Sequence, residues 1–295
     1  MSRTVTVGLD GSPQSLAAAR WAAREAWSRR LPLRLVCALD WHSFTYAPLT
    51  GTDTVTRWAR RMPHEAEARL RRDHPDLRII NEQVTREPVT SLLTAAEDAE
   101  LLVLGSRGLS RVTGFLVGSV ALSVMARAEL PLVLVRADEA AEKERRRDSA
   151  AMASRTAACR DVVLGLDLRR PADPVIEFAF DAAARRKAAL RVLNGWSRPF
   201  PYGYTAPFDA EPAVQNASEL RDVLRPWREK FPDVEVRERS VIGSAAGHLV
   251  DASADAALVV VGRFTHGPWP GPRIGPVTHA VLHHSAAPVA VIAHD

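Results

Sequence analysis

The stretch Val5-Thr6-Val7-Gly8-Leu9-Asp10 recurs 157 residues later as Val162-Val163-Leu164-Gly165-Leu166-Asp167. The same spacing of 157 separates Leu101-Leu102-Val103-Leu104-Gly105 from Leu258-Val259-Val260-Val261-Gly262. A constant spacing from one end of the unit to the other indicates two collinear copies with no net insertion. The chain is therefore predicted to be a duplicated domain rather than a short-period solenoid.

Domain boundaries follow from this repeat. The first copy ends in the apolar run Leu132-Val133-Leu134-Val135, and the second begins near Asp161. The residues between them are rich in Ala, Arg and Glu and have no apolar period, which is typical of a linker. We therefore expect domains at residues 1–136 and 160–295, joined by a linker at 137–159. The length of 295 residues agrees with about 150 residues per domain.

Each copy alternates apolar strands with Ala-rich helical stretches. In the first copy, the expected strands are residues 3–9, 32–39, 77–84, 101–105 and 131–135, and the expected helices are 13–29, 56–73, 88–98 and 118–128. Apolar strands separated by helices are typical of a parallel sheet that is covered on both faces. With right-handed crossovers, this pattern predicts an α/β protein with one doubly wound domain in each copy.

Composition excludes several classes of protein. Hydrophobic residues make up 46% and charged residues 25%, so the bulk of the chain is not disordered. No run approaches the roughly 18 apolar residues of a membrane span. The first residues, Met-Ser-Arg-Thr-Val-Thr-Val, are typical of a strand rather than of a signal peptide. Two cysteines, Cys37 and Cys159, cannot form a disulfide framework, so a cytoplasmic location is expected. Because no apolar run is long enough to span a membrane, no membrane partner is expected either.

Charge is well mixed along the chain, whose net charge of +4 arises from 39 basic and 35 acidic residues. The densest basic cluster, Arg145-Arg146-Arg147, lies within Glu-Lys-Glu-Arg-Arg-Arg-Asp, where both signs occur. Nucleic-acid-binding proteins usually concentrate positive charge on one face. We therefore interpret the cluster as part of a solvated linker and expect no nucleic-acid partner.

A glycine-rich loop follows the expected fourth strand. Gly105, Gly108 and Gly118 precede Ser119 in the spacing G-x2-G-x9-G-S, where a helix is expected to begin. Glycine allows the backbone to approach a phosphate closely and to adopt positive φ. Backbone N–H groups at a helix N-terminus favour anions, and Ser119 adds a hydroxyl donor. We interpret the loop as an anion site; a flexible loop with a capping serine is the alternative.

This loop, together with Val7-Gly8-Leu9-Asp10-Gly11-Ser12 and Pro131-Leu132-Val133-Leu134-Val135, resembles the universal stress protein family in its tandem form. The resemblance covers nearly the whole chain. It implies a five-stranded parallel sheet in the order 3-2-1-4-5 in each domain. The intact glycine loop is similar to that of the ATP-binding branch, which implies a nucleotide-dependent regulatory or stress-response protein.

The resemblance also implies the residues of a nucleotide site in the first copy. The first-strand Asp and the backbone after the second strand would hold adenosine, and the loop would hold ribose and phosphates. The implied ATP-binding residues are Asp10, Ala38, Gly105, Gly108, Gly118, Ser119 and Val120. Mg²⁺ or Mn²⁺ is expected on the phosphates, with no dedicated protein ligands. The residues alone leave open a turn or helix-cap role for Asp10, because Gly-Ser-Pro follows it.

The second copy departs from this pattern. Thr265 replaces the second glycine of the loop, Pro276 replaces the serine, and three further prolines lie between them. Each proline removes a backbone N–H that a phosphate site needs. A lost hydrogen bond to a charged group costs about 1.5–3 kcal/mol. Although Asp167 persists, we expect that the second copy does not bind ATP; whether it binds another ligand stays open.

Two functions stay open beside regulation by ATP. A slow ATPase or nucleotidyl-transfer enzyme would need a group that positions the nucleophile, but the loop from Gly105 to Ser119 contains no Asp or Glu. No catalytic residue is therefore assigned. A pure interaction protein would instead hold its nucleotide without exchanging it. His279 and His283 have an i,i+4 spacing but no third ligand nearby in sequence, so no metal site is assigned. A homodimer is expected.

Overall fold

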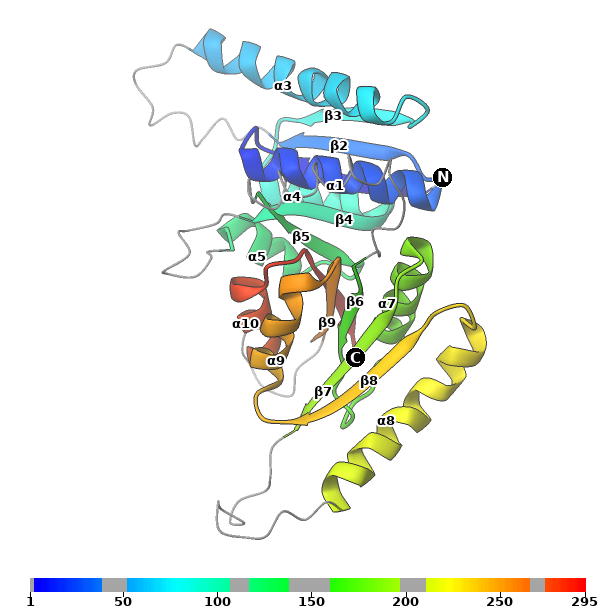
Figure 1. Ribbon diagram of the computed structural model, residues 1–295. Coiled ribbons are helices and arrows are strands. Elements are labelled where there is room, and N and C mark those ends of the chain that lie inside the picture. Colours follow the sequence, from blue (N-terminus) through cyan, green and yellow to red (C-terminus); the bar gives the residue numbers. More distant parts are fainter. Residues whose placement is uncertain (1–2, 39–51, 107–116, 138–159, 197–210, 266–273) are drawn as a thin grey trace. The chain divides into compact units, whose positions relative to one another are not determined.

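Two units make up the chain, Met1–Arg145 and Arg146–Asp295, and each is described by itself. The computed structural model describes residues 3–38, 52–106, 117–137, 160–196, 211–265 and 274–295. In both units, strands and helices alternate along the chain (Figure 1).

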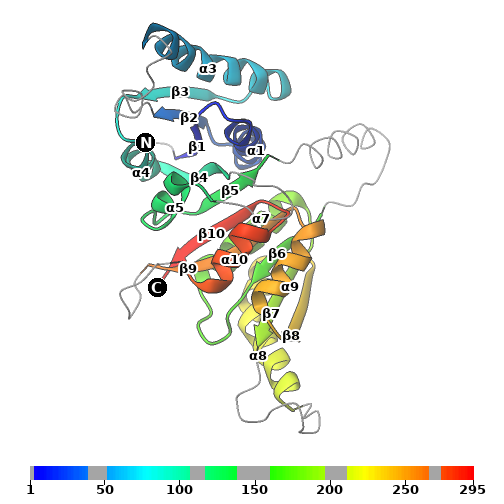
Figure 2. The ribbon, with the colours of Figure 1, turned by 90° about the vertical axis from the view of Figure 1, so that its left-hand side faces the viewer.

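The first unit is a five-stranded parallel sheet in the order β3-β2-β1-β4-β5. Its elements are β1 (Thr4–Leu9), α1 (Pro13–Arg29), β2 (Leu33–Ala38), α3 (Thr52–Asp73), β3 (Ile79–Val84), α4 (Pro88–Glu97), β4 (Ala99–Ser106), α5 (Ser119–Met125) and β5 (Leu132–Arg136). Helix α1 covers one face of the sheet, and α4 and α5 cover the other (Figure 2). The doubly wound fold and its strand order are therefore confirmed.

The second unit repeats this topology, with the parallel strand order β8-β7-β6-β9-β10. Its elements are β6 (Val162–Gly165), α7 (Asp173–Arg186), β7 (Leu190–Trp196), α8 (Glu211–Lys230), β8 (Val236–Ile242), α9 (Ala245–Ala252), the short 3₁₀ helix η1 (Ser253–Asp255), β9 (Leu258–Phe264), α10 (Pro276–His284) and β10 (Val289–His294). Read in chain order within the unit, this is again 3-2-1-4-5.

The core of the first unit lies on both faces of its central strands. Leu101 and Leu102 of β4 are successive residues whose side chains lie on opposite faces, and both are fully buried, as is Val5 of β1. The outer strand β3 has the sequence IINEQV, and only its first residue is buried. Helices cover both faces of a central strand, whereas an outer strand has one exposed side, and this difference explains the change from apolar runs to mixed sequence.

One unusual backbone feature occurs at the same place in both units. The helices α1 and α7 end at Arg30 and Lys187, which lie in the left-handed region with φ of 56° and 50°. These two residues are 157 positions apart, so the feature is part of the repeat. Glycine adopts this conformation without the steric cost that a Cβ atom brings.

We therefore expect Arg30→Gly to stabilise the protein by about 1 kcal/mol, since glycine has no Cβ atom and adopts the left-handed conformation at the end of α1 without steric strain. Urea unfolding of the variant and of the unsubstituted protein measures this gain. Arg30→Ala is the control, because it removes the long side chain but keeps the Cβ atom. Equal stability of the glycine and alanine variants would contradict the explanation.

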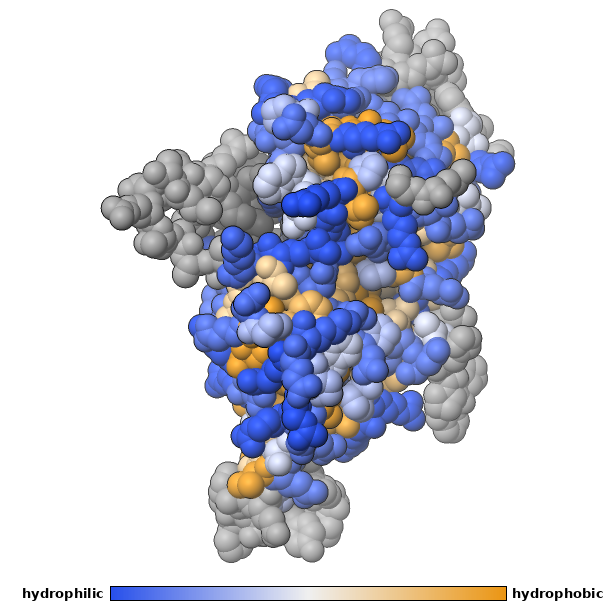
Figure 3. All heavy atoms as spheres, turned by 90° about the vertical axis from the view of Figure 1, so that its right-hand side faces the viewer, coloured by the Kyte–Doolittle hydropathy of each residue, from blue (hydrophilic) through white to orange (hydrophobic). Residues whose placement is uncertain are grey.

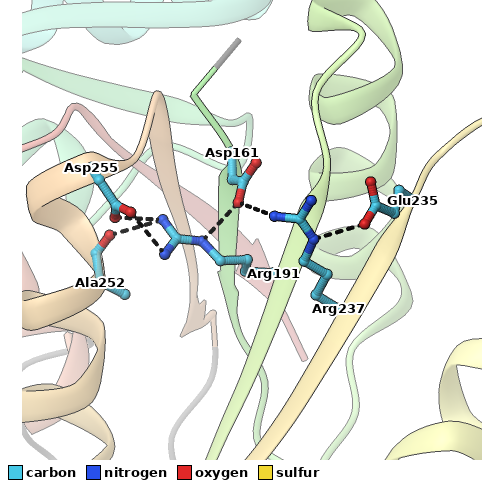
Figure 4. Close-up of polar contacts among 6 residues, drawn as sticks. All are labelled: Asp161, Arg191, Glu235, Arg237, Ala252 and Asp255. Atoms are coloured by element: carbon cyan, nitrogen blue, oxygen red, sulfur yellow. Dashed lines mark hydrogen bonds and ion pairs between the residues drawn. The ribbon is translucent and has the colours of Figure 1, made fainter. Parts of the chain in front are cut away.

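An ion-pair network joins the amino ends of three strands in the second unit (Figure 4). Arg191 of β7 lies at its centre: its Nη2 is 2.7 Å from Asp255 Oδ1, and its Nε is 3.2 Å from Asp161 Oδ2. Asp161 also accepts from Arg237 of β8 at 3.1 Å, and Arg237 pairs with Glu235. The pKa of Asp255 is lowered, and the hydrogen bond from Arg191 is the largest cause. Arg191 therefore favours the ionised form of the Asp255 carboxylate.

Removal of the central arginine by Arg191→Met should cost about 1–2 kcal/mol at neutral pH, because the pairs are partly exposed. The folded-state pKa of Asp255 is below its unfolded value, so its stabilisation is full at neutral pH and disappears as pH falls through the acidic range. The difference in unfolding free energy between the two proteins should therefore shrink from about pH 7 to about pH 3. Arg185→Met, which removes an arginine from an ion pair on α7, is the control. If the difference in unfolding free energy between Arg191→Met and the unsubstituted protein did not depend on pH, the stabilising role of the Arg191–Asp255 pair would be contradicted.

The described surface is mostly hydrophilic, with apolar residues in scattered patches in the view of Figure 3. Among the described residues, the large apolar side chains that are exposed are Trp27, Val214 and Ile242. Within that same part of the chain, no helix combines the length and the apolar character that crossing a membrane requires.

Candidate functional site

A pocket lies in the first unit at the carboxyl ends of β1, β2 and β4. The strand connections change direction between β1 and β4, and open α/β sheets bind ligands at this switch point. The amino ends of α1, α4 and α5 supply the rest of the wall. The described residues enclose about 220 Å³; residues 39–51 and 107–116, which follow β2 and β4 in sequence, lie outside the described part.

Six of the seven residues implied by sequence line this one pocket: Asp10, Ala38, Gly105, Gly118, Ser119 and Val120. The seventh, Gly108, lies outside the described residues. The pocket also contains polar residues that the sequence did not single out, namely Gln14 and Ser15 in the first turn of α1. Their only sequence signal was their position just after Asp10, at the start of a helix.

Asp10 takes part in a tight turn that leads into α1. Its Oδ1 accepts hydrogen bonds from the Ser12 backbone N–H at 3.0 Å and from the Ser12 hydroxyl at 2.6 Å. Ser12 Oγ in turn accepts from the Ser15 N–H at 3.1 Å, so Ser12 is the residue that caps the helix. Gly11 has φ of 77°, which only glycine adopts readily. The turn fixes an acidic group at the pocket wall, beside an already capped helix.

The lining residues from β2 and α4 are apolar. Val36 and Ala38 come from the end of β2, and Pro88 and Leu92 come from the first turns of α4. The N-terminus of α4 is capped by the Glu87 side chain, which accepts from the backbone N–H groups of two following residues. This wall therefore offers apolar contact with few free backbone donors, which suits a flat, mostly apolar group.

The amino end of α5 differs from those of α1 and α4. Its N-cap residue is Gly118, and no side chain of the described residues caps the helix. The first amides of an uncapped helix lack an intrahelical partner and favour an acceptor such as a phosphate or water. Gly118 has φ of −60°, so its backbone conformation does not itself require glycine. A Cβ atom there would meet no described atom within 4 Å, so the glycine leaves open space in front of the helix.

Gly105 has a packing role that the sequence did not reveal. A Cβ atom at this position would lie 2.6 Å from the Gln14 carbonyl carbon and 2.7 Å from the Ser15 nitrogen. Because these are backbone atoms, they cannot move aside without displacing α1. The glycine therefore allows the first turn of α1 to contact the end of β4, which brings Gln14 and Ser15 to the pocket.

Cys37 lies on β2 between two pocket residues, and its side chain is buried. Burial raises the pKa of the Cys37 thiol from an ordinary 9.0 to about 11, and the negative charge of Asp10 adds to the shift. The thiol is therefore protonated at neutral pH. This environment agrees with a small buried residue and not with a reactive redox sensor.

We expect Cys37 to react with iodoacetamide at about pH 8 roughly 100-fold more slowly in the folded protein than in urea, since the thiolate fraction falls by that factor. Peptide mapping by mass spectrometry separates Cys37 from Cys159. Asp10→Asn should leave most of the protection in place, because burial is the larger cause. Alkylation of Cys37 at the same rate in both states would contradict this environment.

The corresponding positions of the second unit have a different local structure. Pro276 is the first residue of α10, where it has no backbone N–H to offer. Thr265, at the place of Gly108, donates its N–H to the carbonyl of His294 at 2.8 Å. The prolines between them lie outside the described residues. Asp167 still accepts from the backbone N–H two residues later, at 3.0 Å from Arg169.

The histidine pair on α10 forms no metal site in the described part of the chain. The rings of His279 and His283 lie 4.3 Å apart, centre to centre. Among the described residues, no three His, Cys, Asp or Glu side chains come together as a metal site would require. The pair is therefore a contact between two rings on α10.

Similarity to known proteins extends over both units. The model of the Universal stress protein family matches residues 1–136 and 159–293. Universal stress protein Rv2005c of Mycobacterium tuberculosis is 32% identical over 309 residues, covering 97% of this chain and 96% of that protein. A solved universal stress protein of Archaeoglobus fulgidus covers 100% of both chains, with a TM-score of 0.69 and 15% identity.

A shorter solved structure, the universal stress protein from Archaeoglobus fulgidus in complex with dAMP, is 24% identical to this chain. It covers 45% of this chain and 97% of its own length, with a TM-score of 0.34. The family match to both halves, together with the relative that spans both chains almost completely, leads to one conclusion. The chain belongs to the universal stress protein family and contains two domains of that family in tandem.

Proposed function

We propose that the first domain binds ATP and that the protein is a nucleotide-dependent regulator in the stress response. The observation that supports this most is the convergence of Asp10, Ala38 and the uncapped start of α5 on one pocket. These features come from the ends of two strands and the start of one helix, and they combine an acidic group, an apolar wall and backbone amides that no described side chain caps. An adenine nucleotide has complementary parts in the same arrangement.

Each part of the nucleotide has a proposed partner. The base would contact the apolar wall of Val36, Ala38 and Leu92, and Asp10 would accept hydrogen bonds from the adenosine end. The phosphates would lie before the amides of Ser119 and Val120, in the open space beside Gly118. Ser119 is exposed, so its hydroxyl is available as a further donor.

Mg²⁺ or Mn²⁺ would accompany the phosphates without a dedicated set of protein ligands. Asp10 is the one carboxylate among the described lining residues, and it already accepts two hydrogen bonds from Ser12. The serine hydroxyls of the pocket are weak ligands for a divalent cation. Magnesium commonly keeps several waters and is held through substrate phosphates, which suits a pocket of this composition.

We propose that nucleotide occupancy, rather than catalysis, is the function. Phosphoryl transfer needs a group that positions the nucleophile near the γ-phosphate, and the proposal places Asp10 at the adenosine end. Slow hydrolysis or nucleotidyl transfer is the alternative activity. We further propose that the protein acts as a homodimer in the cytoplasm.

Mass spectrometry of nucleotide released from the purified, denatured protein tests the ligand, with ATP as the expected species. Incubation with labelled ATP then separates the activities, because a regulator should exchange its nucleotide much faster than it converts it to ADP. Conversion that outpaces exchange would favour the enzyme. Retention without either process would favour a structural role for the nucleotide.

A further inference from the structure

The helix after the first strand is shorter in the second domain, and the missing turn is the one nearest the ligand end of the sheet. Helix α1 has 17 residues and α7 has 14. Their C-caps, Arg30 and Lys187, are equivalent positions 157 apart. The difference therefore lies entirely at the amino end. In the first domain that turn contributes Gln14 and Ser15 to the pocket and contacts Gly105.

The ring of His294 stands at the corresponding place in the second domain. Gly262 is the equivalent of Gly105, and a Cβ atom on it would lie 2.6 Å from His294 Nε2 and 2.8 Å from His294 Cδ2. The equivalent Cβ atom in the first domain would instead meet the backbone of α1. A side chain from the end of β10 thus lies against the glycine that a helix turn contacts in the first domain.

Neighbouring groups hold this ring in position. The His294 ring centre lies 4.7 Å from that of Phe264, and the Arg170 guanidinium lies 5.4 Å from the Phe264 ring centre. The His294 carbonyl accepts the N–H of Thr265 at 2.8 Å, which joins the ends of β9 and β10. A tilted ring contact and a backbone hydrogen bond together hold the end of β10 beside that of β9.

Two further contacts lie at the ends of the neighbouring strands. Thr278 of α10 donates its hydroxyl to the Gly262 carbonyl at 2.7 Å. At the end of β7, Gly195 approaches α9 so closely that a Cβ atom on it would lie 2.5 Å from the Ala245 Cα. Gly195 is the equivalent of Ala38, which lines the pocket of the first domain. Protein groups therefore contact one another at positions whose equivalents line the pocket of the first domain.

We propose that His294 is a built-in occupant of the second domain, which keeps this domain closed without nucleotide and confines the nucleotide response to the first domain. The role of His294 stands on the contacts above. The confinement of the response rests on the proposed function of the first domain. The second domain then supplies a constant framework, while the first changes with nucleotide.

Hydrogen–deuterium exchange of the full chain, read peptide by peptide by mass spectrometry, tests both parts. Without nucleotide, His294→Ala should speed exchange roughly 3- to 10-fold in peptides 162–170 and 258–265, because the contact between the His294 and Phe264 rings is lost. Exchange in the first domain should not change. His294→Phe retains a ring and should behave as the unsubstituted protein, as should His284→Ala, which removes an exposed histidine from the same domain.

ATP with Mg²⁺ should then protect peptides of the first domain equally in the unsubstituted and His294→Ala proteins, and leave 258–265 unchanged. Unaltered exchange in His294→Ala without nucleotide would overturn the role of His294. ATP protection of 258–265 in the unsubstituted protein would overturn the confinement of the response. If ATP protects neither domain while His294→Ala still speeds exchange, the proposed function fails and the role of His294 stands.

Discussion

Gly118→Asp is expected to weaken ATP binding by about 1000-fold while leaving the first domain folded. A carboxylate roughly 4 Å from a phosphate charge costs about 4 kcal/mol at an effective dielectric constant near 20, and each 1.4 kcal/mol is tenfold in affinity. The substituted side chain enters open space, since a Cβ atom at position 118 meets no described atom within 4 Å. Asp at the N-cap also stabilises a helix, so α5 should not unravel.

Calorimetric titration with ATP measures the affinity, and thermal unfolding without nucleotide measures the stability. Gly118→Asn is the matched control, because it has nearly the same size and capping ability without the charge. The asparagine variant should bind ATP much more tightly than the aspartate variant. Unchanged affinity in Gly118→Asp would show that the start of α5 does not contact phosphate.

Arg29→Met should destabilise the first domain by about 3–5 kcal/mol, because it breaks an ion pair with a buried acidic group. Arg29 Nε lies 2.8 Å from Glu25 Oε1 on α1, and both side chains are 5% exposed. Arg29 Nη1 also lies 2.7 Å from Glu100 Oε1 at the start of β4. The arginine therefore links α1 to the sheet beneath it. Urea unfolding at neutral pH measures the loss.

The pair between Arg61 and Glu65 on α3 provides a matched comparison. It has the same i,i+4 geometry, with an N–O distance of 2.9 Å, but the side chains are 77% and 52% exposed. Arg61→Met should change stability by less than about 0.5 kcal/mol. The double variant Glu25→Leu, Arg29→Met should recover part of the loss, since it removes the buried charge as well. Similar losses for Arg29→Met and Arg61→Met would contradict the importance of burial.

The doubly wound α/β class of both domains was predictable from the order of apolar and helical segments, whereas the strand order 3-2-1-4-5 followed only from the resemblance to the family. Segment ends were less predictable. The helix expected at 56–73 begins at Thr52, and the helix expected at 118–128 ends at Met125. Pro63 lies inside α3 and does not end it. Such limits depend on packing and on local hydrogen bonds that a segment's composition does not specify.

The positions of the candidate site residues were predictable from sequence, but the local roles of these residues in capping and packing were not. The positions of Asp10 and Ala38 follow from the ends of strands, which the apolar runs define. The choice between Asp10 and Ser12 as the helix cap depends on one turn of backbone and was settled only by the hydrogen bonds. The packing role of Gly105 needs the distance between α1 and β4, which the sequence does not contain. The same holds for His294, which is far in sequence from the helix turn that it replaces.

Isothermal titration calorimetry of ATP with Mg²⁺ into the purified, nucleotide-free chain tests the central claim most directly. We expect one site per chain, whose affinity Gly118→Asp lowers about 1000-fold and whose affinity substitutions at Pro276 or Thr265 leave unchanged. Absence of binding, or two sites of equal affinity, would contradict it.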